Sequence, residues 1–238
     1  MRSNHEARGR ETDVSLAQLH GSEDRLGGKM KLLVFGSTGG TGRELVKQAL
    51  DQGHEVTAFA RNPDKLGDLT RSSFQVVRGD VLDPAAVEKA VAGHDAVLCA
   101  IGAGAGATSL REEGTRNIVR AMEKAGVRRL ICQSSMGVGD SRANLGFLTK
   151  YVIVPVFLRH AFADHERQEA VVKASTLDWT IVRPPHLNDG RQTGTYRHGF
   201  PPTDTGIQGK ISRADVADFM LKQLADDTYL HQTPGVSY

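Results

Sequence analysis

Short apolar runs recur along this chain, and between them apolar residues repeat every three to four positions. The first run covers 32–35 and ends in a glycine-rich turn. Runs of this length predict β-strands, and the longer repeat predicts amphipathic helices. The later strands are expected at 55–60, 74–79, 95–101, 127–132 and 178–183, and the helices at about 41–52, 84–91, 109–125, 164–174 and 213–224. This alternation predicts an α/β fold with a doubly wound parallel sheet and helices on both faces.

The turn after the first strand has the form of a phosphate-binding loop. It reads Phe35-Gly-Ser-Thr-Gly-Gly-Thr-Gly42, and a helix is expected to begin near Thr41. Unpaired amides at a helix N-terminus attract an anion, and glycine lets the backbone approach a pyrophosphate closely. An ordinary glycine-rich turn is the alternative. The strand before it, the helix after it and the repeated βα units favour a dinucleotide.

The end of the second strand bears on which dinucleotide binds. Enzymes that prefer NAD usually carry an acidic residue there for the ribose 2′-hydroxyl. Here the strand ends at Ala60 and is followed by Arg61, with Lys65 one turn on. These cations suit a 2′-phosphate. Two solvated surface charges are the alternative, but their position favours NADP(H) over NAD(H) as the cofactor.

Further candidate residues follow the other strands. Asp80 and Val81 come after the third strand and could meet an adenine ring, whereas the small residues from Ile101 and Gly102 onward leave room for the middle of a cofactor. Ser134 follows the fifth strand. The carboxyl ends of parallel strands share one edge of a sheet, and ligands bind beyond that edge. The sequence therefore predicts one site there.

Two segments are less regular. The apolar stretch Tyr151–Leu158 is interpreted as core and pocket wall, with a dimer surface as the open alternative. Residues 187–210 are rich in Gly, Pro, Thr and Asp, which is typical of a small C-terminal substrate lid. Ser212 is a good N-cap for the last helix.

Composition narrows the classes of partner and the location. The 238 residues carry a formal net charge of +2, with no dense basic run that would indicate nucleic acid. No apolar stretch is long enough to cross a bilayer. The two cysteines, Cys99 and Cys132, resemble small core residues, and a cytoplasmic location is predicted. His, Cys and carboxylates do not cluster at metal-ligand spacing, so no metal site is expected.

The first 29 residues differ from the rest. They are rich in charged residues, Ser and Gly, and lack the apolar core of a signal peptide. We expect residues 1–29 to be a disordered extension and residues 30–238 to form a single NAD(P)-binding domain. Met30 directly precedes the first strand and is an alternative start to Met1.

Several motifs together resemble a known family. The chain is similar to the atypical short-chain dehydrogenases/reductases of the NmrA-like group, and most of all to the flavin reductase (biliverdin-IXβ reductase) branch. The shared stretches are 35–42, 79–82, 95–97, 113–119, 183–186 and 211–212. Pro184-Pro185-His186, followed by Asp189 and Gly194-Thr-Tyr196, is more specific to that branch. The resemblance covers about residues 31–231 and implies a Rossmann-like fold.

The resemblance also implies roles for particular residues. Ser134 would be the active-site serine, and His165 and His186 would lie near cofactor and substrate, with His165 on the cofactor side. We take Ser134 and His186 as the candidate catalytic residues, although a structural role for Ser134 and a surface position for His165 are the alternatives. The remaining expected cofactor contacts are Gly36, Thr38, Gly39, Gly40, Thr41, Gly42, Arg61, Lys65, Asp80, Val81, Ile101 and Gly102.

One departure from the wider superfamily bears on mechanism. Typical members carry Tyr-x-x-x-Lys on the helix after the fifth strand, where this chain has Ala161 and His165. Alcohol oxidation by a tyrosine base is therefore not expected. The predicted function is NADPH-dependent reduction of a conjugated small-molecule acceptor, such as a flavin or a linear tetrapyrrole, by a monomer or homodimer. The alternative is a non-catalytic redox sensor of the NmrA-like type. A sugar-nucleotide epimerase-like enzyme is disfavoured by the missing tyrosine.

Overall fold

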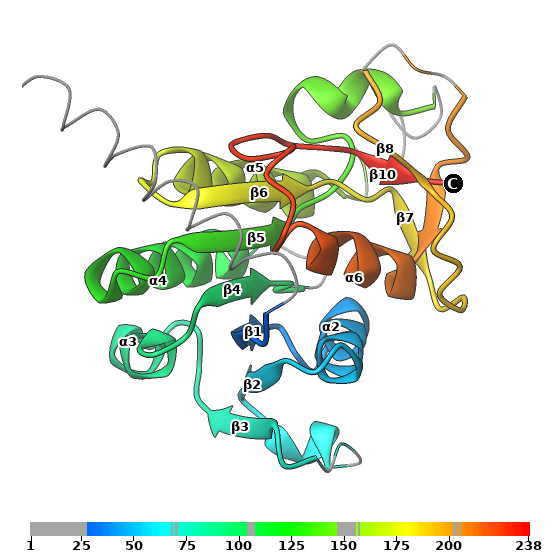
Figure 1. Ribbon diagram of the computed structural model, residues 1–238. Helices are drawn as coiled ribbons and strands as arrows, with labels where there is room; N and C mark the ends of the chain where they lie inside the picture. Colours follow the sequence, from blue (N-terminus) through cyan, green and yellow to red (C-terminus); the bar gives the residue numbers. More distant parts are fainter. Residues whose placement is uncertain are drawn as a thin grey trace, which may run out of the picture.

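The computed structural model describes residues 28–67, 69, 71–103, 108–146, 156, 158–201, 204 and 206–238. In this part of the chain the central sheet has six parallel strands in the order β3-β2-β1-β4-β5-β6 (Figure 1). The strands are β1 (Lys31–Phe35), β2 (Glu55–Ala60), β3 (Phe74–Arg78), β4 (Ala96–Cys99), β5 (Arg129–Gln133) and β6 (Asp178–Val182). The predicted Rossmann-like, doubly wound fold is confirmed.

The strand order reverses between β1 and β4. Leu32 of β1 is in register with Val56 of β2 on one side and with Ala96 of β4 on the other. The chain leaves β1 toward one edge of the sheet and returns through β4 toward the other. A crevice therefore opens above the carboxyl ends of β1 and β4, which is where ligands bind in sheets of this kind.

Both faces of the sheet are covered, because side chains on a strand point alternately to either side. Leu32 and Val34 pack in one core, beneath α2 (Gly40–Asp51) and α6 (Arg213–Lys222). Leu33 and Phe35 pack in the other. That second face carries α3 (Pro84–Val91), α4 (Leu110–Ala125) and α5 (Arg159–Lys173), on the opposite side of the sheet in Figure 1.

Short polar segments fix the ends of several helices. Asp83 caps α3 by accepting hydrogen bonds from the amides of Ala85 and Ala86. Ser212 caps α6 through the amide of Asp215, as predicted. The 3₁₀ turns η1 (Pro63–Leu66) and η2 (Gly139–Asn144) follow β2 and β5. The α5 helix begins five residues earlier than the sequence pattern indicated, at Arg159.

The lid segment folds back on the C-terminal strands. β7 (His186–Asn188) pairs with β9 (Lys210–Ser212), and β8 (Arg197–His198) pairs with β10 (Val236–Ser237). The carboxylate of Asp215 accepts from the amides of Thr193 and Gly194, which ties the segment to the first turn of α6. The predicted substrate lid is thus attached to the last helix.

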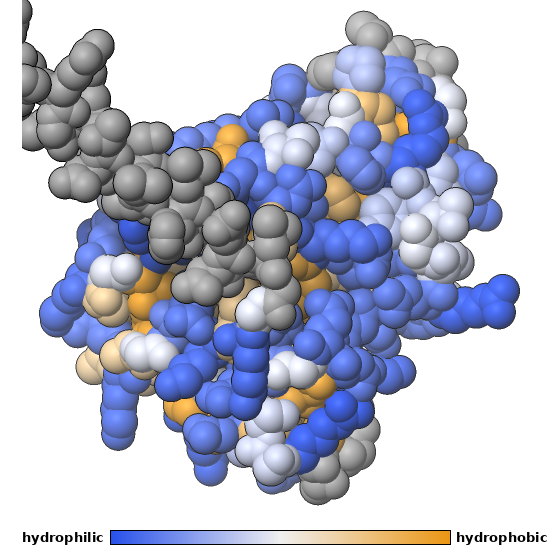
Figure 2. Space-filling view, viewed as in Figure 1, coloured by the Kyte–Doolittle hydropathy of each residue, from blue (hydrophilic) through white to orange (hydrophobic). Residues whose placement is uncertain are grey.

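Hydrophilic residues predominate on the face seen in Figure 2, and apolar residues occur there in small separate groups. Among the described residues, no helix is both long and apolar enough to cross a membrane. The stretch Tyr151–Leu158 lies largely outside the described residues, and residues 1–27 lie outside them entirely. The predicted boundary between residues 29 and 30 therefore stays a prediction.

Candidate functional site

A cleft runs along the carboxyl edge of the sheet and has two connected parts. The Arg61 half, of about 180 Å³, is lined by Arg61, Val81 and the start of the glycine turn. The Ser134 half, of about 340 Å³, is lined by Ser134, His165 and residues that follow β4 and β6. The two halves share Gly39, Ile101 and Gly102. The cleft therefore crosses the point where the strand order reverses.

The glycine turn between the two halves depends on close backbone packing. Gly36 has φ +77°, and an added Cβ would lie 2.2 Å from the carbonyl oxygen of Ala100. An added Cβ at Gly42 would lie 2.1 Å from the carbonyl oxygen of Gly36, so Gly42 lets α2 approach the turn rather than facing the cleft. Gly39 precedes α2 and contributes no side-chain cap. The first amides of the helix are thus available to an anion.

The Arg61 half contains two of the four residues predicted to hold the cofactor's adenosine end. Arg61 and Val81 line it, together with Thr38 of the predicted pyrophosphate site, whereas Lys65 and Asp80 do not. The Asp80 carboxylate instead accepts from the amide of Leu82. Arg43, which sequence reasoning missed, donates from Nη1 to the carbonyl oxygen of Lys65 and so joins α2 to the loop after β2.

Two polar side chains in the Ser134 half have no hydrogen-bond partner. Ser134 is 2% exposed and its Oγ is unpaired, whereas Gln133 is partly exposed but has a buried Oε1 that is also unpaired. The amide of Ser134 donates to the carbonyl oxygen of Val182, which fixes the residue at the end of β5. Buried polar atoms are rarely left unpaired in native proteins. Thus both atoms are suited to hydrogen bonds with a ligand or water in the cleft.

His165 also lines the Ser134 half, on α5. Its Nδ1 lies 3.0 Å from Oε1 of Gln168. Burial, together with the positive charge of Arg111, lowers the pKa of His165 to about 4. The imidazole is therefore neutral near pH 7 and is a poor proton donor there.

Arg111 begins α4 and is buried against α5. Its Nη1 lies 3.2 Å from Oδ2 of Asp164, its Nη2 donates to the carbonyl oxygen of Ala103, and its Nε has no partner. Asp164 is fully buried and also accepts from the backbone amides of Arg111 and Glu112. No feature of the sequence near Asp164 indicated that this residue on α5 caps α4.

Arg213 brings a second guanidinium to the Ser134 half, from the start of α6. An added Cβ at Gly40 would lie 2.3 Å from Cδ of Arg213, so the arginine side chain lies across the glycine turn. Its Nη1 is 2.6 Å from the exposed carboxylate of Asp189 in the lid. Arg213 therefore connects the lid to the predicted phosphate site.

His186 lies apart from these residues. It is exposed on β7 and is absent from the residues that line the cleft, whereas its neighbours Pro185 and Leu187 are among them. The structure thus brings Ser134 and His165 together but does not bring His186 to them. Its predicted catalytic role stays a prediction.

A buried ion pair supports the floor of the Ser134 half. Arg183, 1% exposed at the end of β6, donates from Nε and Nη2 to the carboxylate of Glu169 and from Nη1 to Asp140. These bonds join β6 to α5 and η2. Breaking such a pair by removing one partner leaves a buried charge uncompensated.

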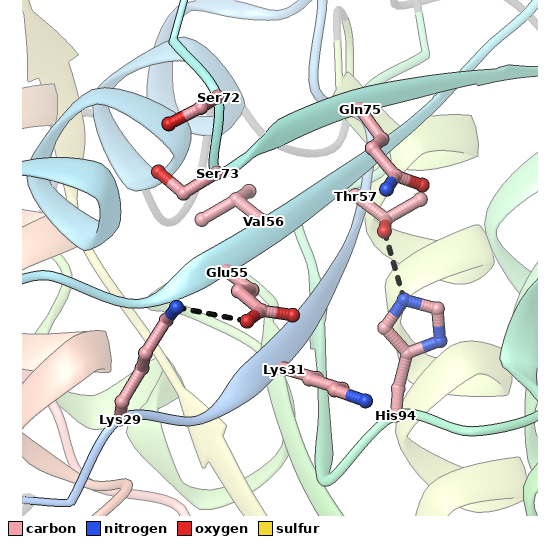
Figure 3. Close-up of a pocket in the computed structure, with 9 residues that line it drawn as sticks. All are labelled: Lys29, Lys31, Glu55, Val56, Thr57, Ser72, Ser73, Gln75 and His94. Carbon is pink, nitrogen blue, oxygen red and sulfur yellow. Dashed lines mark hydrogen bonds and ion pairs between the residues drawn. The ribbon is translucent and has the colours of Figure 1, made fainter.

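A second hollow lies at the amino edge of the sheet, away from the cleft. Figure 3 shows Lys29 directed at Glu55 and His94 directed at Thr57. These polar groups bond to one another, which is typical of a solvated strand edge. In the described parts of the chain, no three His, Cys, Asp or Glu side chains are arranged to hold a metal ion.

The residues of the cleft fit a dinucleotide. The glycine turn forms a cradle that a Cβ would fill, α2 offers its open N-terminus, and Ser134 offers an unpaired hydroxyl. These features define a Rossmann-like dinucleotide-binding domain. The family model described as NAD(P)H-binding matches residues 36–227, so the chain belongs to this NAD(P)H-binding family.

Individual relatives agree with this assignment. An uncharacterised chloroplastic protein of Arabidopsis thaliana is 32% identical over 206 residues, which cover 83% of this chain and 72% of that protein. ChuY of Escherichia coli O157:H7, described as an anaerobillin reductase, is 26% identical with a TM-score of 0.71, and the match covers 87% of this chain and 96% of ChuY. A short-chain dehydrogenase/reductase of Veillonella parvula in complex with NADP shares the fold, with a TM-score of 0.75 at 18% identity, over 88% of this chain and 94% of that one.

Proposed function

We propose that this protein is an NADPH-dependent reductase of a conjugated acceptor, such as a flavin or a linear tetrapyrrole. The observation that carries the proposal is the composition of the Ser134 half. Among the described residues that line it there is no tyrosine, lysine or carboxylate, and the His165 imidazole is neutral near pH 7. A reaction that needs a strong acid or base from the protein does not suit such a site. Hydride transfer to a conjugated ring does.

The bound cofactor would supply the hydride, and water would supply the proton that completes a two-electron reduction. The protein's own residues would bind and orient. The amides of the glycine turn would hold the pyrophosphate. Ser134 Oγ and Gln133 Oε1 would hydrogen-bond a polar edge of the nicotinamide or the acceptor. Pro184 and Leu187 would provide an apolar wall against a flat ring.

Preference for NADPH over NADH belongs to the same proposal. Arg61 lines the cleft beyond β2, and Arg43 is held beside the loop that carries Lys65. A guanidinium pairs well with a phosphate dianion, which only NADPH carries on its ribose. This supports the assignment of Arg61 to the 2′-phosphate, with Lys65 as a more distant contributor.

The relatives support reduction over sensing. ChuY is described as an anaerobillin reductase, and a Streptomyces griseus relative, 31% identical over 153 residues that cover 46% of its length, is described as a (4-alkanoyl-5-oxo-2,5-dihydrofuran-3-yl)methyl phosphate reductase. Both names refer to reductases. A cytoplasmic location and a monomeric or homodimeric state stay predictions.

The test is steady-state oxidation of NADPH by the full chain, with FMN, FAD or biliverdin as acceptor. We expect turnover with at least one of them, and little loss of rate in Ser135→Ala compared with Ser134→Ala. Tight binding of NADPH without turnover on any acceptor would instead support the sensor alternative.

A further inference from the structure

The most unusual group in the cleft is the buried guanidinium of Arg111. It is 6% exposed, yet it lines the Ser134 half beside Ser134 and His165. Buried arginines normally direct their five N–H donors at partners. Here Nη1 and Nη2 each have one partner, and Nε has none.

The carboxylate next to Arg111 is already shared among several donors. Asp164 accepts from the backbone amides of Arg111 and Glu112 at 3.2 and 3.1 Å. It also lies 3.7 Å from Nη2 of Arg167. The N-terminal amides of α4 thus stabilise the Asp164 charge independently of the Arg111 side chain.

Charges around the pair do not balance. Glu112, the other carboxylate in this group, is bonded to Arg116 and Arg167 at 2.7 and 2.6 Å. The three arginines at 111, 116 and 167 therefore share two carboxylates. Arg116 and Arg167 are partly exposed to water, whereas Arg111 is not. Of the three guanidinium groups, that of Arg111 at the cleft is therefore the least solvated.

The described residues that line the Ser134 half do not supply the missing anion. The charged side chains among them are Arg111 and Arg213. Arg213 is paired with Asp189 and lies across the glycine turn, close to the place of the pyrophosphate. Arg111 lies beyond the end of β4, and its Nη2 reaches Ala103. An anion that pairs with Arg111 would have to come from a second ligand.

We propose that Arg111 forms a subsite for an acidic oxygen group of the acceptor, a carboxylate or a phosphate. The acceptor is therefore an organic acid, and Arg111 orients it against the cofactor. Burying an incompletely paired cation is unfavourable in the free protein, and binding of the acidic group lowers this free-energy cost. This subsite rests on the proposed reductase function.

The experiment compares matched acceptors that differ in one acidic group. The full chain, saturated with NADP⁺, is titrated with biliverdin and its dimethyl ester, and with FMN and riboflavin. The dissociation constants are measured by fluorescence quenching. We expect at least one acid to bind on the order of tenfold more tightly than its uncharged counterpart. A preference within the biliverdin pair assigns a carboxylate, and one within the flavin pair assigns a phosphate.

Three variants test whether Arg111 causes the preference for acidic acceptors. Arg111→Gln should lower the acid preference to about one, and Asp164→Asn should raise it, because the side chain keeps an oxygen for the α4 amides but loses the competing charge. Arg120→Gln, at an exposed position on α4 outside this group of charges, should leave the preference unchanged. Should Arg111→Gln fail to fold, the opposite shift in Asp164→Asn still tests the assignment.

Two results would count against the subsite. Equal binding of acid and uncharged acceptor by the wild type, with turnover of both, would overturn it and leave the reductase function standing. A preference that persists in Arg111→Gln and does not change in Asp164→Asn would overturn it as well. Binding of NADP⁺ without binding of any of the four acceptors would overturn the reductase function and the subsite together.

Discussion

The glycine turn of the cleft presents backbone amides and small residues to a ligand, whereas the Ser134 half also presents side chains that come from distant parts of the sequence. Gly36, Thr38 and Gly39 are adjacent in the chain and belong to one strand-turn-helix unit. In the Ser134 half, Arg111, His165 and Arg213 come from α4, α5 and α6. The glycine turn is a local structure, whereas the rest of the cleft, including Arg61 and Val81, is assembled by the tertiary fold.

This difference separates phosphate binding, which many proteins share, from recognition of one particular acceptor. A phosphate is bound by amides and a helix N-terminus, which any chain with the right turn can provide. A particular acceptor needs side chains of particular charge and hydrogen-bonding capacity. We therefore expect substitutions in the glycine turn to affect folding and cofactor together, and substitutions in the Ser134 half to affect specific ligands.

The largest effect is expected at the glycine turn. Gly36→Ala would force a Cβ to 2.2 Å from the carbonyl oxygen of Ala100 at φ +77°, and should lower the free energy of unfolding by about 3 kcal/mol or more. Gly53→Ala is the matched control, because Gly53 has φ +88° but no atom within 4 Å of an added Cβ. The Gly53→Ala variant should lose only about 1 kcal/mol of its free energy of unfolding. Urea unfolding measures both, and equal losses would show that close packing at Gly36 is unimportant.

A smaller effect, confined to one cofactor, is expected from Arg61. Arg61→Ala should weaken NADPH binding by about 10- to 100-fold, because a charge-assisted bond to the 2′-phosphate is lost. Binding of NADH should change little. Arg71→Ala is the control, since Arg71 is exposed and pairs with Asp51 outside the cleft. Fluorescence titration of the wild type and the two variants gives the dissociation constants for NADPH and NADH. Equal losses for NADPH and NADH would contradict the 2′-phosphate assignment.

The same contrast explains how far the sequence could be interpreted. The β2 strand was predicted at its observed bounds, and the cap Ser212 was placed correctly, because strand pattern and capping are local. Local signals also identified the glycine turn. The Asp164 cap on α4 could not be predicted, since it joins residues 53 positions apart and depends on how α5 packs. The pairing of β8 with β10 has the same non-local origin.

The pH dependence of stability tests whether the Ser134 half contains a neutral histidine. The pKa of His165 lies near 4 in the folded protein and about 6.5 in the unfolded chain, so the unfolded chain takes up a proton first as the pH falls. The contribution of neutral His165 to the free energy of unfolding is complete above about pH 6.5 and is lost as the pH falls toward 4. Between pH 7.5 and 5.0 the loss should be about 2 kcal/mol.

In His165→Gln, the free energy of unfolding measured with urea should fall less between these two pH values, because this contribution is absent. His160→Gln, at an exposed position on the same helix, should keep it. The same pH dependence in wild type and His165→Gln would mean that His165 is not held neutral, and that the Ser134 half does offer a proton donor.

The smallest effect concerns Arg213, where the two halves meet. Its guanidinium lies across Gly40 and is paired with Asp189, so the lid carboxylate and a bound pyrophosphate would compete for the same group. Arg213→Gln should weaken NADPH binding roughly tenfold, as expected for one lost charge-assisted contact. Asp189→Asn should instead strengthen binding about two- to threefold, because an exposed ion pair contributes little and its removal frees the arginine. Fluorescence titration measures both constants, with Arg191→Gln, an exposed lid residue, as the control. If Asp189→Asn weakened NADPH binding as much as Arg213→Gln, the ion pair would position Arg213 for the cofactor rather than compete with it, and the two halves would act as one unit.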